Sequence, residues 1–445
     1  MPMSKPSDLK RIAEQSGNEQ ICYVLGAGFS NESAYKLPVA TGFLSREARI
    51  YCQDVTNRKG TIAVADHPEL PQLLSRLEER YGDLGSLNLE SVMSDLFERT
   101  AGVGRAWSDR DVATVDRLLL PADPSIQAAA DDIPLPPLPQ GADLRRDYEL
   151  LLLYICLRLR IVEVPGAECP AECPAECPMV RRLLHTVRRR DSIITLNYDT
   201  IIERHLTYRE RGPGDRDKRL ENLDLYIGSS GASYSGGGGT MFGRFQPRRG
   251  GFLAKLHGSV NWRACSEPAC PNHRYIESTD RRRSDNLDGA EQLHCGLCGN
   301  TPDTVVIPPV ATKPFDRFPK LRLMWLQAYH SLRLANRWVF IGVSLAPTDM
   351  HLRSLLRAAS EDWIGTEMAP PGQICVVNPD GKVAGRLREC LSPWVQNALS
   401  APDAGIVTFD KISDYLAAVE RTDVDRATGS PTADTPTQRH PKVIE

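Results

Sequence analysis

The sequence predicts an α/β fold with a doubly wound parallel sheet and an inserted helical subdomain. Short apolar runs rich in β-branched residues recur along the chain, as in strands that are buried on both faces. Helical patterns separate most of these runs, which is typical of a Rossmann-like sheet covered by helices on both sides. Two cysteine pairs, Cys265 with Cys270 and Cys295 with Cys298, add a small module with the ligand spacing of a zinc site.

Seven apolar runs are the predicted strands of this sheet. Each is short, and each is bounded by polar or glycine-containing segments, so we expect a buried parallel strand at every one. The runs are 21–25, 192–196, 252–256, 304–307, 338–343, 374–377 and 406–409.

The gap between the first two strands is far longer than a simple crossover needs. Helical patterns at 69–81, 87–99 and 144–162 predict that residues 45–190 form a helical insertion. The proline-rich stretch Pro121 to Pro139 is expected to be a loop or linker. Three Ala-Glu-Cys-Pro repeats, residues 167–178, place a proline at every fourth position and so exclude a regular helix. Their cysteines could bind metal or oxidise, or the repeat is only an expanded loop.

The remaining boundaries follow from composition. We expect the main domain to span residues 1–420, the zinc-binding module to span 263–303 and residues 421–445 to form a disordered tail, because the tail is polar and lacks periodicity. The run 228–251, rich in glycine, serine and arginine, is expected to be mobile.

Charge and composition limit the class of protein. A chain of 445 residues with 41% hydrophobic and 25% charged residues is typical of a globular protein. The net charge of −3 argues against a constitutively basic nucleic-acid surface, although Arg188 to Arg190 and Arg281 to Arg283 could contact phosphates. The longest apolar run, Leu150 to Leu157, is too short to span a bilayer, and the first residues lack a secretory signal, so we expect a cytoplasmic protein. In that compartment the 12 cysteines are expected to be metal ligands and buried thiols.

A glycine turn, Gly26-Ala27-Gly28, follows the first predicted strand and is succeeded by Ser30. Glycines at such a turn let the backbone approach a phosphate, which the free N–H groups and the helix dipole then favour. The third glycine of the usual dinucleotide pattern is absent, and an ordinary strand-to-helix turn also explains the pair.

Polar side chains follow other predicted strands. Asn197 and Asp199 come directly after the second strand, at the carboxyl edge where open α/β sheets bind ligands. Asn197 could instead cap a helix that begins near Asp199. His257 stands beside a glycine at the end of the third strand, where a histidine can act as a base.

Two later strands also end in small polar residues. One ends with Gly342 and Ser344, and the next with Asn378. Their hydroxyl and amide groups suit the ribose of a nucleotide.

In their order and spacing these motifs resemble the sirtuin superfamily, over a stretch from about Ile21 to Phe409. The sequence looks closest to the sirtuin-like branch of bacterial antiphage defence, in which Asn-Tyr-Asp and Leu-His-Gly-Ser-x-Asn-Trp motifs accompany NAD hydrolysis. It departs from the deacylating sirtuins at two places. Residues 36–43 replace Gly-Ile-Pro-Asp-Phe-Arg, and residues 306–310 replace the Phe-Gly-Glu segment of the acyl-peptide groove.

The resemblance implies roles for the motif residues, with NAD as the substrate. Asn197 would hold the ribose or the attacking water, Asp199 would bind the nicotinamide amide, and His257 would accept a proton. The remaining cofactor-binding positions would be Gly26, Ala27, Gly28 and Ser30 at the pyrophosphate, and Gly342, Ser344 and Asn378 at the adenosine half. The metal would be a structural zinc at Cys265, Cys270, Cys295 and Cys298; His273 and His294 are possible substitute ligands, and a metal-free remnant of the site is the alternative.

The function implied is an NAD hydrolase that releases nicotinamide and ADP-ribose and depletes NAD as a defence effector. An NAD-dependent protein deacylase or ADP-ribosyltransferase is the alternative enzyme, and a catalytically silent nucleotide-sensing subunit is the alternative of another class. An unregulated NAD hydrolase would poison its own cell, so we expect control through a homo-oligomer or a partner. By resemblance that partner would be a ring-forming DNA-translocase ATPase, and we expect no membrane association and no sequence-specific nucleic-acid binding.

Overall fold

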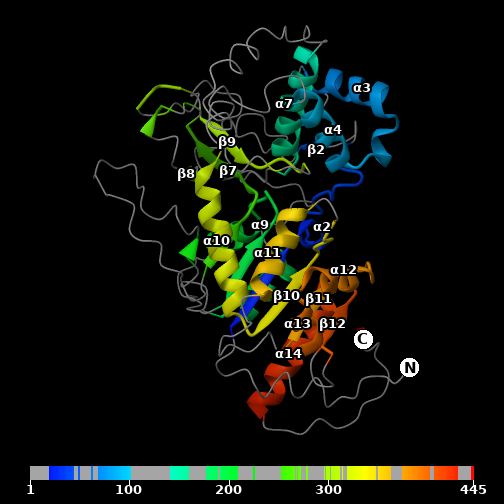
Figure 1. Ribbon diagram of the computed structural model, residues 1–445, viewed down its shortest axis with the longest axis vertical. Coiled ribbons are helices and arrows are strands. Elements are labelled where there is room, and N and C mark those ends of the chain that lie inside the picture. Colours follow the sequence, from blue (N-terminus) through cyan, green and yellow to red (C-terminus); the bar gives the residue numbers. More distant parts are fainter. Residues whose placement is uncertain are drawn as a thin grey trace, which may run out of the picture.

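Figure 1 shows the computed structural model of the chain. The structure describes residues 20–44, 49–50, 62–63, 69–101, 141–159, 177–188, 191–208, 224–225, 252–265, 267, 269–271, 277–278, 295, 297–300, 302–310, 313, 318–346, 349–361, 373–400, 405–428 and 442–444. The predicted loop 121–139, the run 228–251, His273, His294 and all but the last two residues of the cysteine–proline repeats lie outside these ranges.

An eight-stranded sheet forms the centre of the molecule, in the order β13-β12-β11-β10-β1-β4-β6-β5. All neighbouring pairs are parallel except β12 with β13. Between the short edge strands β5 and β13, the inner strands numbered along the chain run 3-2-1-4-5-6, which is the doubly wound, dinucleotide-binding order. The strands are β1 (Ile21–Leu25), β4 (Ser192–Thr195), β5 (Asp224–Leu225), β6 (Phe252–Lys255), β10 (Arg337–Ile341), β11 (Gln373–Val377), β12 (Ile406–Phe409) and β13 (Lys442–Ile444). The predicted fold class is therefore confirmed.

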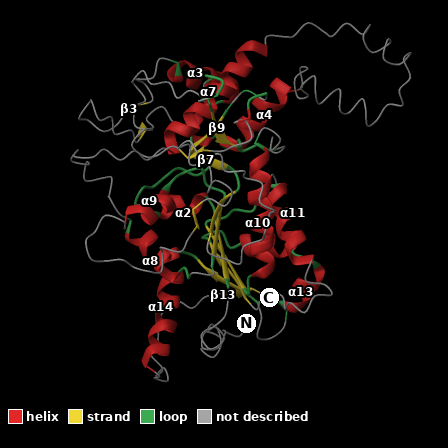
Figure 2. Cartoon of the chain, turned by 90° about the vertical axis from the view of Figure 1, so that its left-hand side faces the viewer, coloured by secondary structure: helices red, strands yellow, loops and turns green. Residues whose placement is uncertain are grey.

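Helices cover both faces of this sheet, as Figure 2 shows. On one face lie α8 (Pro178–Thr186), α9 (Ile201–Tyr208) and α14 (Ile412–Thr428), and on the other lie α10 (Pro319–Leu334), α11 (Met350–Glu361), α12 (Val383–Cys390) and α13 (Pro393–Ala398). Alternate strand residues enter the two cores, so Tyr23 and Leu25 pack on the first face while Cys22 and Val24 pack on the second. This explains why the strands are apolar along most of their length rather than only at every other position.

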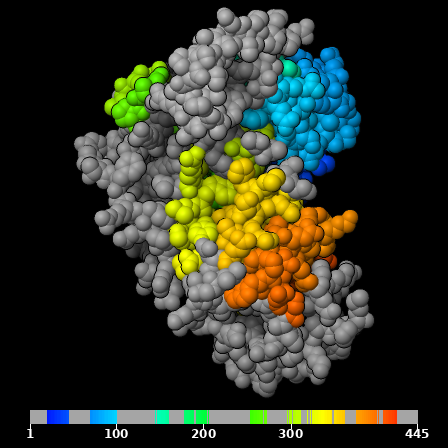
Figure 3. Space-filling view, viewed as in Figure 1, coloured from blue at the N-terminus to red at the C-terminus, as the bar shows by residue number. Residues whose placement is uncertain are grey.

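The segment between β1 and β4 is helical, as its periodicity predicts. It contains α3 (Leu70–Tyr81), the 3-10 turn η2 (Leu84–Ser86), α4 (Leu89–Ala101), α7 (Gly141–Leu159) and a short antiparallel pair, β2 (Arg49–Ile50) with β3 (Ile62–Ala63). The apolar sides of α3, α4 and α7 continue the core of the first face, and Figure 3 shows the blue surface of α3 and α4 above the yellow and orange surface of α11 and α12. In the described part of the chain, no helix combines the length and apolar character needed to cross a membrane.

A second, antiparallel sheet lies beside the first and corrects one predicted strand. It consists of β7 (Gly258–Ala264), β8 (Glu277–Ser278) and β9 (Asp303–Val306) in the order β8-β7-β9. The run 304–307 is therefore not a parallel strand of the main sheet, because most of it forms β9 and pairs with β7. Its apolar side chains contribute to the core, but a short apolar run does not specify which strand it will pair with.

The expected disordered tail is wrong for the part of it that the structure describes. Residues 421–428 continue α14, and residues 442–444 form β13, which pairs antiparallel with β12. Without β13, strand β12 would be the sheet edge and its outer N–H and C=O groups would lack a strand partner. The amino-acid composition of a segment does not reveal whether its backbone pairs with a strand.

Candidate functional site

The glycine turn after β1 packs directly against the turn after β10, where the strand order reverses. Gly28 N donates to the carbonyl of Gly342 at 3.0 Å, and Gly342 has a φ of 64°. A Cβ added at Gly26 would lie 2.6 Å from Gly342 O, one at Gly28 would lie 2.7 Å from Gly342 Cα, and one at Gly342 would lie 2.2 Å from Phe29 N. The close approach of the two turns therefore requires the glycines whether or not a phosphate is bound.

Gly342→Ala is expected to lower the free energy of unfolding by at least about 2 kcal/mol. A left-handed backbone costs a non-glycine residue on the order of 1–3 kcal/mol, and overpacking adds a similar amount. Denaturant unfolding measures the change, with Gly381→Ala as the control because a Cβ there meets no atom within 4 Å. Equal stability of the two variants would contradict the contact.

Three predicted site residues form one hydrogen-bonded network at the ends of β1 and β4. Ser30, on α2 (Ala27–Glu32), donates from its hydroxyl to Asp199 Oδ2 at 2.6 Å. The Asn197 amide donates to Ser30 Oγ at 2.8 Å and to the carbonyl of Gly26 at 3.0 Å. Ser30 is thus a buried link in the network rather than an exposed hydroxyl, and Asn197 is tied to the glycine turn.

Asp199 performs the capping that was the alternative role for Asn197. Its Oδ1 accepts from the N–H of Ile201, the first residue of α9, at 3.0 Å. Burial raises the pKa of Asp199, while nearby Lys255 and the hydrogen bonds from Ser30 and Ile201 oppose that rise. The carboxylate is therefore held in position from two sides.

His257 occupies the turn between β6 and β7 and is only 5% exposed. Its ring lies between those of Tyr198 and Trp325, with centroid separations of 6.2 Å and 6.0 Å, and Trp325 Nε1 donates to the carbonyl of Leu256 at 2.9 Å. Burial lowers the pKa of His257 well below 6.5, and the positive charge of Lys313 lowers it further. The imidazole is therefore neutral at physiological pH.

One ring nitrogen of His257 has no partner in the described part of the fold. Nε2 is buried without a hydrogen-bond partner among the residues that the structure describes. A neutral imidazole accepts a proton at the nitrogen that carries its lone pair, which is how a histidine acts as a general base. Tyr198, which lies between Asn197 and Asp199 in sequence, packs against the ring.

The predicted adenosine side is formed by the ends of β10 and β11. The Asn378 amide donates to the carbonyl of Val343 at 3.0 Å and its Oδ1 accepts from Asp380 N at 2.9 Å, so Asn378 shapes this edge. Ser344 is exposed, and its carbonyl accepts from Arg386 Nε at 2.9 Å. The side-chain hydroxyl of Ser344 is thus the group that faces solvent.

A buried ion pair beneath this site was missed by the sequence analysis. Lys255 Nζ lies 2.8 Å from Glu203 Oε1, and the two side chains are 0% and 7% exposed. The available signal was a single lysine at the end of the apolar run 252–256, since lysine is rarely buried unless it is paired.

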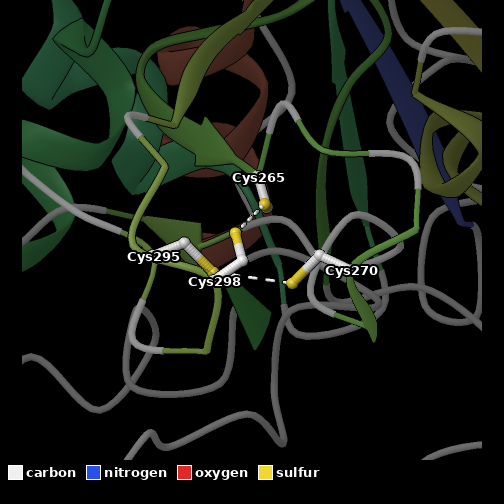
Figure 4. Close-up of side chains that lie close together, drawn as sticks. All are labelled: Cys265, Cys270, Cys295 and Cys298. Carbon is white, nitrogen blue, oxygen red and sulfur yellow. Dashed lines mark hydrogen bonds between the residues drawn. The ribbon is translucent and has the colours of Figure 1, made fainter.

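The four cysteines of the predicted module converge in space (Figure 4). Cys265 follows β7, and Cys295 and Cys298 precede β9. The Sγ atoms of Cys265 and Cys298 are 3.4 Å apart, those of Cys270 and Cys295 are 3.7 Å apart, and all four lie within 4.8 Å of one another. Four thiolates about 2.3 Å from a tetrahedral zinc would be separated by about 3.8 Å, so the cluster fits a structural zinc ion.

Comparison with known proteins gives structural neighbours only. No protein-family model matches the chain, and no curated protein matches it. A Sir2 homologue solved as an NAD complex is 15% identical, with a TM-score of 0.38 and 95% of each chain covered. A mutant Sir2 homologue in complex with ADP ribose is also 15% identical, with a TM-score of 0.38, and covers 97% of this chain and 100% of its own. At this identity and TM-score the neighbours do not establish a function, which has to be argued from the residues of this chain.

Proposed function

We propose that this chain is a sirtuin-like NAD hydrolase that cleaves the nicotinamide–ribose bond and releases nicotinamide and ADP-ribose. The observation that carries the proposal is the arrangement at the carboxyl edge of the sheet. There a neutral buried histidine, whose Nε2 has no hydrogen-bond partner among the described residues, lies beside the segment that holds Asn197 and Asp199. Cleavage of this bond requires an oriented ribose and a stabilised oxocarbenium-like transition state more than it requires a strong nucleophile.

Each residue has a role that its environment supports. Asp199 is fixed by Ser30 and Ile201, so its carboxyl group can orient the nicotinamide amide. Asn197 is positioned at the glycine turn by its two N–H bonds, so its amide oxygen can orient the ribose or the attacking water. His257 accepts the proton from a ribose hydroxyl or from that water at Nε2.

The rest of NAD is assigned to the two turns at the strand-order reversal. Nucleotides bind in doubly wound sheets at this place. We assign the pyrophosphate to the turn formed by Gly26, Ala27 and Gly28, and the adenosine half to the edge formed by Gly342, Ser344 and Asn378. Ser30 then acts on the pyrophosphate side through Asn197 and Asp199 rather than by direct contact.

The backbone after β9 favours hydrolysis over peptide deacylation. Ile307 N donates to the carbonyl of His257 at 2.8 Å, and Ile307 O accepts from the Tyr198 hydroxyl at 2.6 Å. Both groups of Ile307 are therefore engaged within the chain instead of being offered to the backbone of an incoming peptide, which is how an extended substrate adds to a sheet edge.

Product analysis tests the proposal. Purified protein is incubated with NAD, with and without an acetyl-lysine peptide, and the products are separated by chromatography. Nicotinamide and free ADP-ribose in equal amounts, independent of the peptide, are the expected products. Peptide-dependent O-acyl-ADP-ribose indicates a deacylase and ADP-ribose attached to protein indicates a transferase. NAD binding without turnover, at high protein concentration and with added cell extract, indicates a sensor.

The pH profile of kcat/KM is expected to stay level from pH 7.5 to 6.5 and to fall only below 6.5. His257 must be neutral to accept a proton, and its pKa in the folded protein is lowered well below 6.5 by burial and by Lys313. The base form therefore persists as the pH falls through the usual range of histidine. Initial rates across pH 5–8 measure the acidic fall of kcat/KM. A fall whose midpoint lies at or above pH 6.5 would contradict the assignment of His257 as a neutral base.

Activity is expected to be low in the isolated chain and to rise on assembly. A partner can switch the enzyme only by binding the active state more tightly, and a change from 1:99 to 99:1 requires about 5.5 kcal/mol. We assign the contact surface for the partner to the helices of the insertion, since the sheet does not need them to form the site. We assign the biological role to NAD depletion in antiphage defence. Turnover per chain is measured against protein concentration and with added cell extract. High turnover by a dilute, verified monomer that neither condition changes would overturn this model.

A further inference from the structure

A lysine and a glutamate are buried beneath the site, where charged side chains are rare unless they are paired. Lys255 is the last residue of β6 and Glu203 is in the first turn of α9, and their side chains pair at 2.8 Å under the segment that connects β4 to α9. Lys255 Nζ also donates to the carbonyl of Asp199. One ammonium group therefore ties the strand that leads to His257 both to α9 and to the backbone of Asp199.

A gain in folding stability is a weak explanation for a buried ion pair. Removing two charges from water costs more than their mutual attraction returns in many proteins, so a well-packed apolar pair of similar volume is often neutral or stabilising. In some proteins a buried polar or ionic group is retained because it fixes one arrangement among several. Here the arrangement that it fixes is the path of the backbone through residues 199–203.

We propose that Lys255 and Glu203 are positioning residues that hold the Asn197–Asp199 segment in register with His257. Resting on the proposed NAD hydrolysis, this assigns to the pair the relative placement of the groups that orient NAD and the group that accepts the proton. Lys255 precedes His257 by two residues on one side of the site, and its Nζ contacts Asp199 on the other. A shift of about 1 Å between such groups is enough to cost about 10²-fold in rate.

The contacts around the ion pair show how Asp199 is held in place. Asp199 Oδ2 and Oδ1 are bound by Ser30 and Ile201, and its carbonyl is bound by Lys255, so the residue is fixed at both its side chain and its backbone. Without the lysine, Asp199 keeps only its side-chain contacts, while the carbonyl of the preceding Tyr198 still accepts from Val260 N at 3.0 Å. The backbone after Tyr198 would then lose its fixed point at Asp199, which would shift the Asp199 carboxyl group relative to His257 without exposing the core.

The test removes both charges together. The double variant Lys255→Met, Glu203→Leu fills the same space with apolar groups and leaves no buried charge unpaired. We expect its melting temperature to equal or exceed that of the wild type, its KM for NAD to stay within about threefold, and its kcat to fall about 10²-fold. The control is Arg182→Gln, Glu420→Gln, which removes an exposed ion pair between α8 and α14 and is expected to leave all three quantities unchanged.

Hydrogen exchange of the peptide that contains residues 196–203 supplies a readout that does not depend on turnover. Faster exchange there, with unchanged exchange in β1 and β10, supports the positioning role. Wild-type kcat together with wild-type exchange in a folded double variant would overturn it. If the wild type releases no nicotinamide even at high concentration and with added cell extract, the proposed hydrolysis fails, and the exchange comparison still decides whether the pair holds this segment. If the double variant does not fold, the single variant Lys255→Arg is tested instead, because arginine can still pair with Glu203. Retained kcat in this variant supports the role of the pair. A 10²-fold loss of kcat in the folded, still-paired variant counts against it.

Discussion

Replacing His257 with alanine is expected to lower kcat for nicotinamide release by 10²- to 10⁴-fold, which is the usual contribution of a positioned acid–base group. Asn197→Ala is expected to have an effect of the same order, because its amide connects the glycine turn to Ser30 and so fixes the segment that we assign to the ribose. Nicotinamide release under saturating NAD measures both losses.

Folding must be separated from chemistry in these variants, since both side chains have structural contacts. The loss of the two Asn197 hydrogen bonds costs on the order of 1–3 kcal/mol, which a folded domain can tolerate. His330→Ala, on α10, and Asn336→Ala, at the opposite edge of the sheet, are the matched controls. Wild-type turnover in either site variant, with melting temperatures like those of the controls, would remove that residue from the proposed site.

Replacing Cys295 and Cys298 together with serine is expected to abolish zinc binding and to lower thermal stability. Apparent binding free energies of small thiolate zinc sites are about 10–16 kcal/mol, and much of this is available to fold the module. The loss should extend to activity, because β9 follows the cluster and Ile307 contacts both His257 and Tyr198. We expect hydrogen exchange to increase in residues 303–310 and kcat to fall.

Metal analysis decides whether the site is a zinc site. One zinc ion per chain is expected in protein purified without chelator, and none in the double variant. Cys390→Ser is the control, because this buried cysteine lies on α12, far along the chain from the module, and donates to the carbonyl of Arg386 at 3.0 Å. Wild-type protein without zinc would identify the cluster as a metal-free remnant.

Local patterns were sufficient to predict the sheet and most of the polar edge. A strand buried on both faces is apolar along most of its length, so β1, β4, β6, β10, β11 and β12 can be recognised without their neighbours. Ends of parallel strands fall at one edge of the sheet, which is why Asn197 and Asp199 could be placed at a ligand-binding edge before any contact was known. The bonds of Ser30 to both residues were found only in the structure. The spacing of the cysteines likewise predicts a four-thiol metal site, and in the structure the four thiols lie close together.

What the sequence determined by itself was therefore the fold class, the helical insertion and the residue types at the site. The tertiary structure alone decided the partners: β9 pairs with β7, β13 covers β12, Asp199 rather than Asn197 caps α9, and Lys255 pairs with Glu203. The physical reason is range. Burial and periodicity are properties of neighbouring residues, whereas strand pairing, hydrogen-bond partners and the compensation of a buried charge depend on groups that are far apart in the chain and meet only once it has folded.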